Sequence, residues 1–201
     1  MTPTYITKEA NHFIKCRILD KYMSGHSGFI AGGCFKNIFN SQKIKDIDIF
    51  FEKEEDFEEA LSQYTLKSEY SNVYENSRVS CFKNNETGVK IELVRTFFKT
   101  VEDTLNSFDF TITKFAYHKQ IEVDGSVKYL YKYLDTFFED LHCNRLVIND
   151  RLDFPISTFE RSYRYKAYGF GLCQESKSKL INALKNQESS DISNDLYNGM
   201  D

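Results

Sequence analysis

The chain has 201 residues, of which 41% are hydrophobic and 28% charged, a globular balance that excludes a disordered or fibrous protein. The net charge of −4 at pH 7 excludes the broadly basic surface of a non-specific nucleic-acid-binding protein. No apolar run approaches the roughly 20 residues of a membrane helix, and no secretory signal is visible, so we expect a cytoplasmic protein without a membrane partner.

Metal sites built on cysteine and histidine are also excluded. The five cysteines are scattered, odd in number and never form a CxxC pair, so we expect reduced thiols and neither a disulfide framework nor a zinc site. The four histidines have no spacing typical of metal ligands.

Helices and strands alternate in the first half of the predicted fold. Apolar residues at helical spacing after a capping Thr7 indicate the first helix, and alternation of polar and apolar residues indicates the clearest strands. In chain order we predict a helix over 7–23, a strand over 29–31, a brief helix over 34–39, a strand over 46–51, a helix over 54–64, one or two weaker strands between 66 and 84, and a strand over 90–96.

The second half is predicted to become helical. In chain order we predict a short helix over 101–107, a strand-like stretch over 108–118, a hairpin over 120–131 that turns at Asp124-Gly125, helices over 135–147 and 156–185 with a break near 169–171, and a disordered polar tail from 186. The order predicts an α+β fold, a small mixed β-sheet flanked by helices. We assign its parts to a sheet domain over 1–134, a helical region over 135–187 and an acidic tail over 188–201.

Two acidic residues on one predicted strand point to a metal ion. Residues i and i+2 of a strand share a face, so Asp46 and Asp48 project together while Ile47 and Ile49 face the core. Paired carboxylates are costly without a cation, and Mg²⁺ prefers such oxygen ligands. Glu92, on the strand KIELVRT, would complete a three-acid site if that strand lay beside the first. Three acids with one or two Mg²⁺ ions suit phosphoryl or nucleotidyl transfer.

The segment before the acidic strand suits a triphosphate. Gly32 and Gly33 lie between a predicted strand and a predicted helix, where backbone amides can approach phosphate without an obstructing Cβ. Lys36 and Lys45 are near enough in sequence to neutralise phosphate charge. The order of strand, GG, short helix, DxD strand and later acidic strand is much less common than any of these features alone.

This pattern resembles the DNA polymerase β-type nucleotidyltransferase superfamily, and most closely the head and neck domains of bacterial tRNA CCA-adding enzymes and poly(A) polymerases. The matching segments, in the order of that family's motifs, are AGGCFKNIFNSQKIKDIDIFF, VKIELVRT, VEDTLNSFDFTITKFAY, YLDTFFEDLHCNRL and ERSYRYKAYGF. They cover roughly residues 28–172. The resemblance implies a nucleotidyltransferase head followed by a helical neck, in a minimal version without the family's body and tail.

The resemblance also implies roles for individual residues. Asp46, Asp48 and Glu92 would be the catalytic acids and bind Mg²⁺, with Glu92 helping to activate the attacking hydroxyl. The positions assigned to the nucleoside triphosphate are Gly32, Gly33, Lys36, Asn37, Lys45, Asp109 and Thr113. Arg161 and Arg164, on the neck helix, would contact RNA phosphates.

Two departures from the family concern the nucleotide. Ser107 and Phe108 stand where the family has two arginines before Asp109. The three positions with which the family's neck reads the incoming base hold Phe154, Pro155 and Thr158. The side chains that recognise C and A in the family are therefore absent.

The main hypothesis is a Mg²⁺-dependent nucleotidyltransferase that acts on RNA, with a tRNA 3′ end as acceptor. A second hypothesis keeps the chemistry but places the nucleotide on a protein side chain or an antibiotic. A third is a catalytically silent, antitoxin-like binding module, against which the intact Asp46, Asp48 and Glu92 count.

Overall fold

The computed structural model describes residues 3–148 and 152–187 of the chain. These residues divide into two compact units. The first unit consists of residues 3–105 and 113–135, and the second of residues 106–112, 136–148 and 152–187. The chain therefore enters the second unit briefly before it completes the first, and 188–201, the predicted acidic tail, lies outside the described residues.

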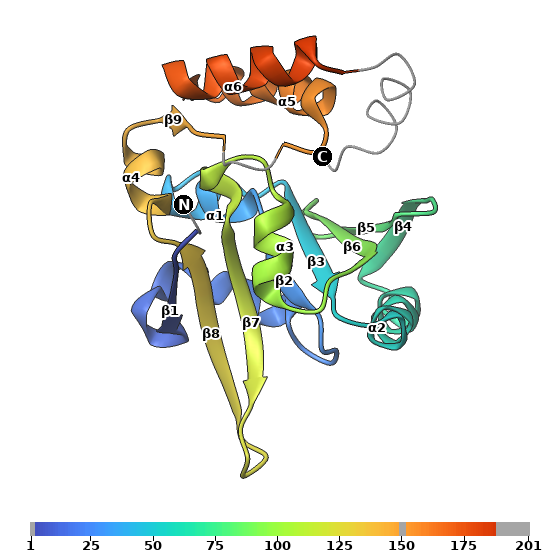
Figure 1. Ribbon diagram of the computed structural model, residues 1–201. Coiled ribbons are helices and arrows are strands. Elements are labelled where there is room, and N and C mark those ends of the chain that lie inside the picture. Colours follow the sequence, from blue (N-terminus) through green and yellow to red (C-terminus); the bar gives the residue numbers. More distant parts are fainter. Residues whose placement is uncertain (1–2, 149–151, 188–201) are drawn as a thin grey trace. The chain divides into compact units, whose positions relative to one another are not determined.

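The first unit is built on an eight-stranded mixed sheet with the strand order β1-β8-β7-β2-β3-β6-β5-β4 (Figure 1). Among the described pairs, β3 and β6 run parallel and the others antiparallel. The strands are β1 (Tyr5–Glu9), β2 (Phe29–Ala31), β3 (Asp46–Phe51), β4 (Tyr70–Glu75), β5 (Val79–Asn84), β6 (Lys90–Phe97), β7 (Phe115–Ile121) and β8 (Val127–Leu134). The predicted α+β class with a mixed sheet is confirmed.

Helices pack on this sheet because its strands alternate polar and apolar side chains. Ile47, Ile49 and Ile91 share one face and are fully buried. On the same face, the Phe13 ring lies 5.6 Å from that of Phe115 and 5.2 Å from that of Tyr131. The helices of this unit are η1 (Ala10–His12), η2 (Ile14–Tyr22), α1 (Cys34–Phe39), α2 (Glu54–Leu66) and α3 (Val101–Ser107), whose last two residues belong to the second unit. The short helix η3 (Thr111–Thr113) belongs to the second unit except for Thr113.

The predicted N-terminal helix over 7–23 is wrong at its start and in its type. Tyr5–Glu9 forms β1, which pairs with β8 in the register Thr7 to Lys132, and the rest is 3₁₀-helix. Of the apolar residues that indicate this helix, Leu19 and Tyr22 are buried, whereas Ile14 and Ile18 are exposed. The buried residues Cys16, Leu19 and Tyr22 follow the three-residue period of a 3₁₀-helix. Pairing with β8 gives the backbone of residues 5–9 hydrogen-bond partners along one edge, a long-range effect that local spacing does not reveal.

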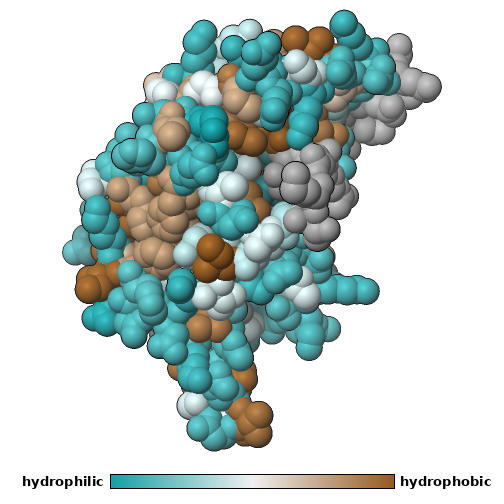
Figure 2. Space-filling model, turned by 60° about the vertical axis from the view of Figure 1, so that its left-hand side comes forward, coloured by the Kyte–Doolittle hydropathy of each residue, from teal (hydrophilic) through white to brown (hydrophobic). Residues whose placement is uncertain are grey.

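The β7–β8 hairpin turns where the sequence predicts. Gly125 has a φ of +82°, and the Asp124 carboxylate accepts hydrogen bonds from the backbone amide and hydroxyl of Ser126. The hairpin extends beyond its neighbour β2, and Ile121 and Val123 near its tip are exposed. Figure 2 shows apolar surface at the bottom of the molecule, where the hairpin ends.

The second unit is helical with a small parallel β-ladder. Its elements are α4 (Phe137–His142), β9 (Arg145–Leu146), α5 (Pro155–Ala167), β10 (Gly171–Leu172) and α6 (Gln174–Lys185). The predicted helix over 135–147 is shorter because Arg145 and Leu146 pair with β10 instead. The predicted break near 169–171 is present, and Gly169 follows α5 with a φ of +92°. None of the described helices is long and apolar enough to cross a bilayer.

His26, in the first unit, is expected to make folding sensitive to acid. Its buried ring donates from Nε2 to the Tyr22 carbonyl at 2.9 Å and accepts at Nδ1 from the Gly28 amide at 3.1 Å, so the ring is neutral. Burial, with the charge of Lys119, lowers its pKa to about 4. The stability that this group contributes is complete above the unfolded pKa of 6.5 and is lost as the pH falls through about 4.

Urea unfolding at pH 7 and pH 4 tests this. The stability difference between the wild type and His26→Gln should shrink by about 3 kcal/mol at the lower pH, because the variant cannot titrate there. An equal difference at both pH values would contradict the assignment of a neutral His26.

Candidate active site

The two strands that carry the predicted acids lie side by side. β3 and β6 are parallel neighbours, and their register pairs Asp48 with Glu92 and Asp46 with Lys90. Paired residues of neighbouring strands point to the same face, so Asp46, Asp48 and Glu92 share the face opposite the buried isoleucines. Asp46 is exposed, and Asp48 and Glu92 are partly exposed.

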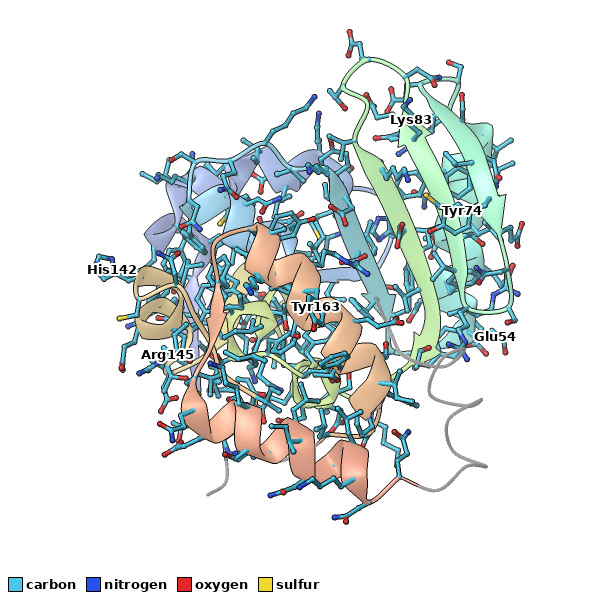
Figure 3. The ribbon with its side chains drawn as sticks, turned by 90° about the horizontal axis from the view of Figure 1, so that it is seen from above. Glu54, Tyr74, Lys83, His142, Arg145 and Tyr163 are labelled. Atoms are coloured by element: carbon cyan, nitrogen blue, oxygen red, sulfur yellow. The ribbon has the colours of Figure 1, made fainter. Side chains whose placement is uncertain are left out.

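Further residues continue this row across the sheet. Asp48 pairs with Ala31 of β2, Glu92 pairs with Cys81 of β5, and Cys81 pairs with Tyr74 of β4. The Tyr74 hydroxyl donates a hydrogen bond to Glu92 Oε1 at 2.8 Å. Figure 3 labels Tyr74 on the outermost strand. The sequence does not single out Tyr74, since it lies between 66 and 84, where the pattern indicates only one or two weaker strands. Its hydroxyl reaches Glu92 through the pairing of β4 with β5 and of β5 with β6.

The electrostatic environment of this row is negative. Burial raises the pKa of the Cys81 thiol to about 11, and the Glu92 carboxylate adds to the effect. Burial followed by the charge of Asp48 raises the pKa of the Cys34 thiol well above its usual value. Both thiols are therefore protonated at neutral pH, and the carboxylates supply the charge that could attract a cation.

The glycine segment differs in part from the prediction. The Gly32 amide donates to the Phe115 carbonyl at 3.1 Å, so this amide is used within the sheet instead of facing a phosphate. Gly32 has a φ of +101°, a conformation that side-chain-bearing residues rarely adopt. Gly33 is the residue before α1. Gly32 therefore turns the chain from β2 towards α1, and amide contacts to phosphate stay a prediction for Gly33.

A substitution at Gly32 should accordingly act through the backbone. Gly32→Ala is expected to destabilise the fold by about 1–3 kcal/mol, since it forces a strained dihedral angle. Thermal denaturation measures this, with Gly33→Ala as the matched control because Gly33 has an ordinary φ of −68°. Equal melting temperatures for the two variants would contradict this role.

The basic residues of the segment also lie on the first unit. Lys36 is buried, and its Nζ donates to Asn37 Oδ1 at 2.6 Å. Burial lowers the pKa of Lys36, and the nearby charge of Asp46 partly opposes this effect. Lys45 precedes β3, and its carbonyl accepts from the Lys90 amide at 2.9 Å. The three predicted nucleotide positions Lys36, Asn37 and Lys45 thus adjoin one end of the acidic strand.

Predicted residues of the second unit are engaged in a different network. Asp109 Oδ2 accepts hydrogen bonds from Thr158 Oγ1 at 2.7 Å and from Arg161. The Arg161 side chain is only 11% exposed, so the pair with Asp109 occupies a guanidinium that we predicted to contact RNA. Arg164 of the same unit is exposed, whereas Thr113, the last residue of η3, belongs to the first unit. Thr158 occupies a predicted base-reading position, and its hydrogen bond to Asp109 was not foreseen.

The donor chemistry of the acidic row fits a divalent cation. Three carboxylates on one face of two paired strands are the oxygen ligands that Mg²⁺ selects. Within residues 3–148 and 152–187, however, no three acidic, histidine or cysteine side chains are gathered closely enough to hold a metal ion. The backbone therefore places these three acids next to one another on one face of the sheet, but their carboxylate groups do not converge on a common point.

Solved structures with a similar fold are tRNA-processing enzymes. A CCA-adding enzyme in complex with CTP matches with a TM-score of 0.66 and 16% identity, over 95% of this chain and 49% of that one. The Thermotoga maritima CCA-adding enzyme complexed with tRNA matches with a TM-score of 0.64 and 17% identity, over 95% of this chain and 50% of that one. At these identities the likeness establishes a nucleotidyltransferase-like fold.

A curated relative comes from a bacteriophage. The Gabija anti-defense 2 protein of Bacillus phage SPbetaL7 is 25% identical over 144 residues, which are 70% of this chain and 33% of that protein. The chain thus spans about a third of the length of this relative. The model of the Gabija anti-defense 2 (Gad2) family matches residues 5–144, most of the chain. The chain therefore belongs to the Gabija anti-defense 2 family.

Proposed function

We propose that this chain is a Mg²⁺-dependent nucleotidyltransferase, which moves a nucleoside monophosphate from a nucleoside triphosphate to the 3′ hydroxyl of an RNA such as tRNA. The observation that carries the proposal is the cross-strand pair Asp48–Glu92 with Asp46 on the same face. The similar structures in complex with tRNA or CTP favour RNA and a nucleotide as substrates.

The proposed chemistry divides the work among the residues of the first unit. Three carboxylates, those of Asp46, Asp48 and Glu92, would hold Mg²⁺, which when bound neutralises phosphate charge and lowers the pKa of a coordinated hydroxyl. Glu92 would accept the proton of the acceptor hydroxyl. The acceptor oxygen bonds to the α-phosphorus as the bond to the β-phosphate oxygen breaks, and pyrophosphate leaves. Lys36 and Lys45 would offset the charge of this leaving group.

Membership of an anti-defense family favours a second acceptor. If the Gabija defence is opposed by covalent modification, the nucleotide is transferred to a hydroxyl side chain of a Gabija protein instead of RNA. The residues of the first unit would act in the same way, since the two reactions differ only in the molecule that carries the hydroxyl from which Glu92 accepts a proton. Phe154 and Pro155 stand at two positions with which the CCA-adding family reads the incoming base, and neither side chain can recognise C or A as that family does. This loss is compatible with either acceptor.

One labelling experiment tests both acceptors. The protein is incubated with each α-labelled nucleoside triphosphate and Mg²⁺, together with bacterial RNA or with purified Gabija proteins. Label in a tRNA-sized band supports the first acceptor, and label in a Gabija protein supports the second. The absence of label in either, with no Mg²⁺-dependent nucleotide binding, would contradict transfer and leave a silent binding module.

A further inference from the structure

We propose that Tyr74 is a positioning residue that holds the Glu92 carboxylate away from Asp48 until a divalent cation binds. The inference rests on the proposed function, because it concerns the same acidic row. Its starting observation is the 2.8 Å hydrogen bond from the Tyr74 hydroxyl to Glu92 Oε1.

The strand order gives the direction in which Glu92 is drawn. In the sequence β3-β6-β5-β4, Asp48 lies on one side of Glu92 and Tyr74 on the other. Neighbouring strands are about 4.8 Å apart, so Tyr74 is on a strand roughly 10 Å from β6 and its side chain must reach back across β5. The hydrogen bond therefore fixes the carboxylate on the side of β5, over Cys81, and away from Asp48.

A further observation agrees with this position. No three acidic, histidine or cysteine side chains come together as a metal site within the described part of the chain, even though the backbone register pairs Asp48 directly with Glu92. The orientation of the Glu92 side chain explains why the carboxylates do not converge although their strands are paired in register.

The hydrogen bond to Tyr74 also relieves a repulsion. Two carboxylates on directly paired residues repel each other, and a neutral hydroxyl donor on the far side of Glu92 separates their charges. A divalent cation reverses the preference, since it attracts both carboxylates. Binding of the cation must then break the hydrogen bond to Tyr74, and the cost of breaking it lowers the affinity of the site. Tyr74 is 39% exposed, so its freed hydroxyl can bond to water.

The test is a calorimetric titration of the full chain with Mn²⁺ as a probe. Tyr74→Phe keeps the ring and removes the hydroxyl, so we expect Mn²⁺ to bind about three- to tenfold more tightly than to the wild type, the equivalent of one hydrogen bond. Tyr70→Phe is the matched control, because it removes a hydroxyl from the same strand, and should leave the affinity unchanged. In a Glu92→Ala background the effect of Tyr74→Phe should disappear.

The outcomes separate this inference from the proposed function. Unchanged or weaker Mn²⁺ binding by Tyr74→Phe, with wild-type binding that depends on Asp48, overturns the role of Tyr74 and leaves the metal site standing. Failure of both the wild type and Tyr74→Phe to bind Mn²⁺ overturns the inference together with the proposed function. If Tyr74→Phe still raises the Mn²⁺ affinity in the Glu92→Ala background, the inference is also overturned, because the Tyr74 hydroxyl then acts through a group other than Glu92.

Discussion

Replacing Asp46 and Asp48 together by asparagine should reduce nucleotidyl transfer by about a thousandfold or more, because a bound cation supplies several kcal/mol of transition-state stabilisation. Asparagine retains the size of the side chain, and both positions lie on the face of β3 opposite its buried isoleucines. The variant should therefore fold. The measurement is the rate of label transfer at saturating nucleotide and Mg²⁺.

The stability of this variant gives an independent check. Asp48 is directly paired with Glu92, and like charges in such a position destabilise a sheet by about 0.2–1 kcal/mol. The double variant should consequently unfold at a slightly higher urea concentration than the wild type. Glu54→Gln with Glu59→Gln, two exposed acids of α2, is the matched control and should retain full activity. Turnover by the Asp46→Asn, Asp48→Asn variant would refute the assignment of these residues to the metal.

Replacement of Asp140 by alanine should cause a large loss of stability. The Asp140 carboxylate is buried, with Oδ2 accepting from the Thr111 hydroxyl at 2.6 Å and Oδ1 accepting from Arg145 Nε at 2.7 Å. It thus ties η3, α4 and β9 together within the second unit, and Figure 3 labels Arg145 beside α4. Alanine leaves a buried hydroxyl and a guanidinium without this partner, which costs about 3 kcal/mol.

Chemical denaturation of the full chain measures this loss. Glu139→Ala is the matched control, since Glu139 also accepts from Arg145, at 2.8 Å, but its side chain is 64% exposed. An exposed ion pair contributes about 0–1 kcal/mol, so the control should differ little from the wild type. Equal effects of the two substitutions would contradict the role of the buried network.

The local elements of the fold could be predicted because their patterns are short and self-contained. The predicted strand over 46–51 and the predicted helix over 34–39 have the bounds of β3 and α1. In β3, the alternation of acidic and apolar residues predicts both the strand and which side chains lie on each of its two faces. The same alternation in β6 predicts a strand that carries Glu92, and the structure adds that this strand lies beside β3 and runs parallel to it.

The parts that the sequence does not reveal depend on long-range pairing. β1 forms because β8, more than a hundred residues later, offers it an edge. Tyr74 reaches Glu92 only because β4, β5 and β6 are adjacent. Likewise, the pairing of Asp109 with Arg161 joins residues that are 52 positions apart. A family resemblance can suggest such residues, but their partners are known only once the chain is folded.

In the proposed mechanism, three carboxylates, those of Asp46, Asp48 and Glu92, together bind a divalent cation beside a nucleotide. The most direct measurement is anomalous X-ray diffraction from crystals grown with Mn²⁺ and a non-hydrolysable nucleoside triphosphate. We predict an anomalous peak within coordination distance of the three carboxylates, with the α-phosphate beside it. Two results would contradict this binding mode. One is a bound nucleotide whose Mn²⁺ lies away from the three carboxylates, and the other is the absence of an anomalous peak at these carboxylates at saturating Mn²⁺.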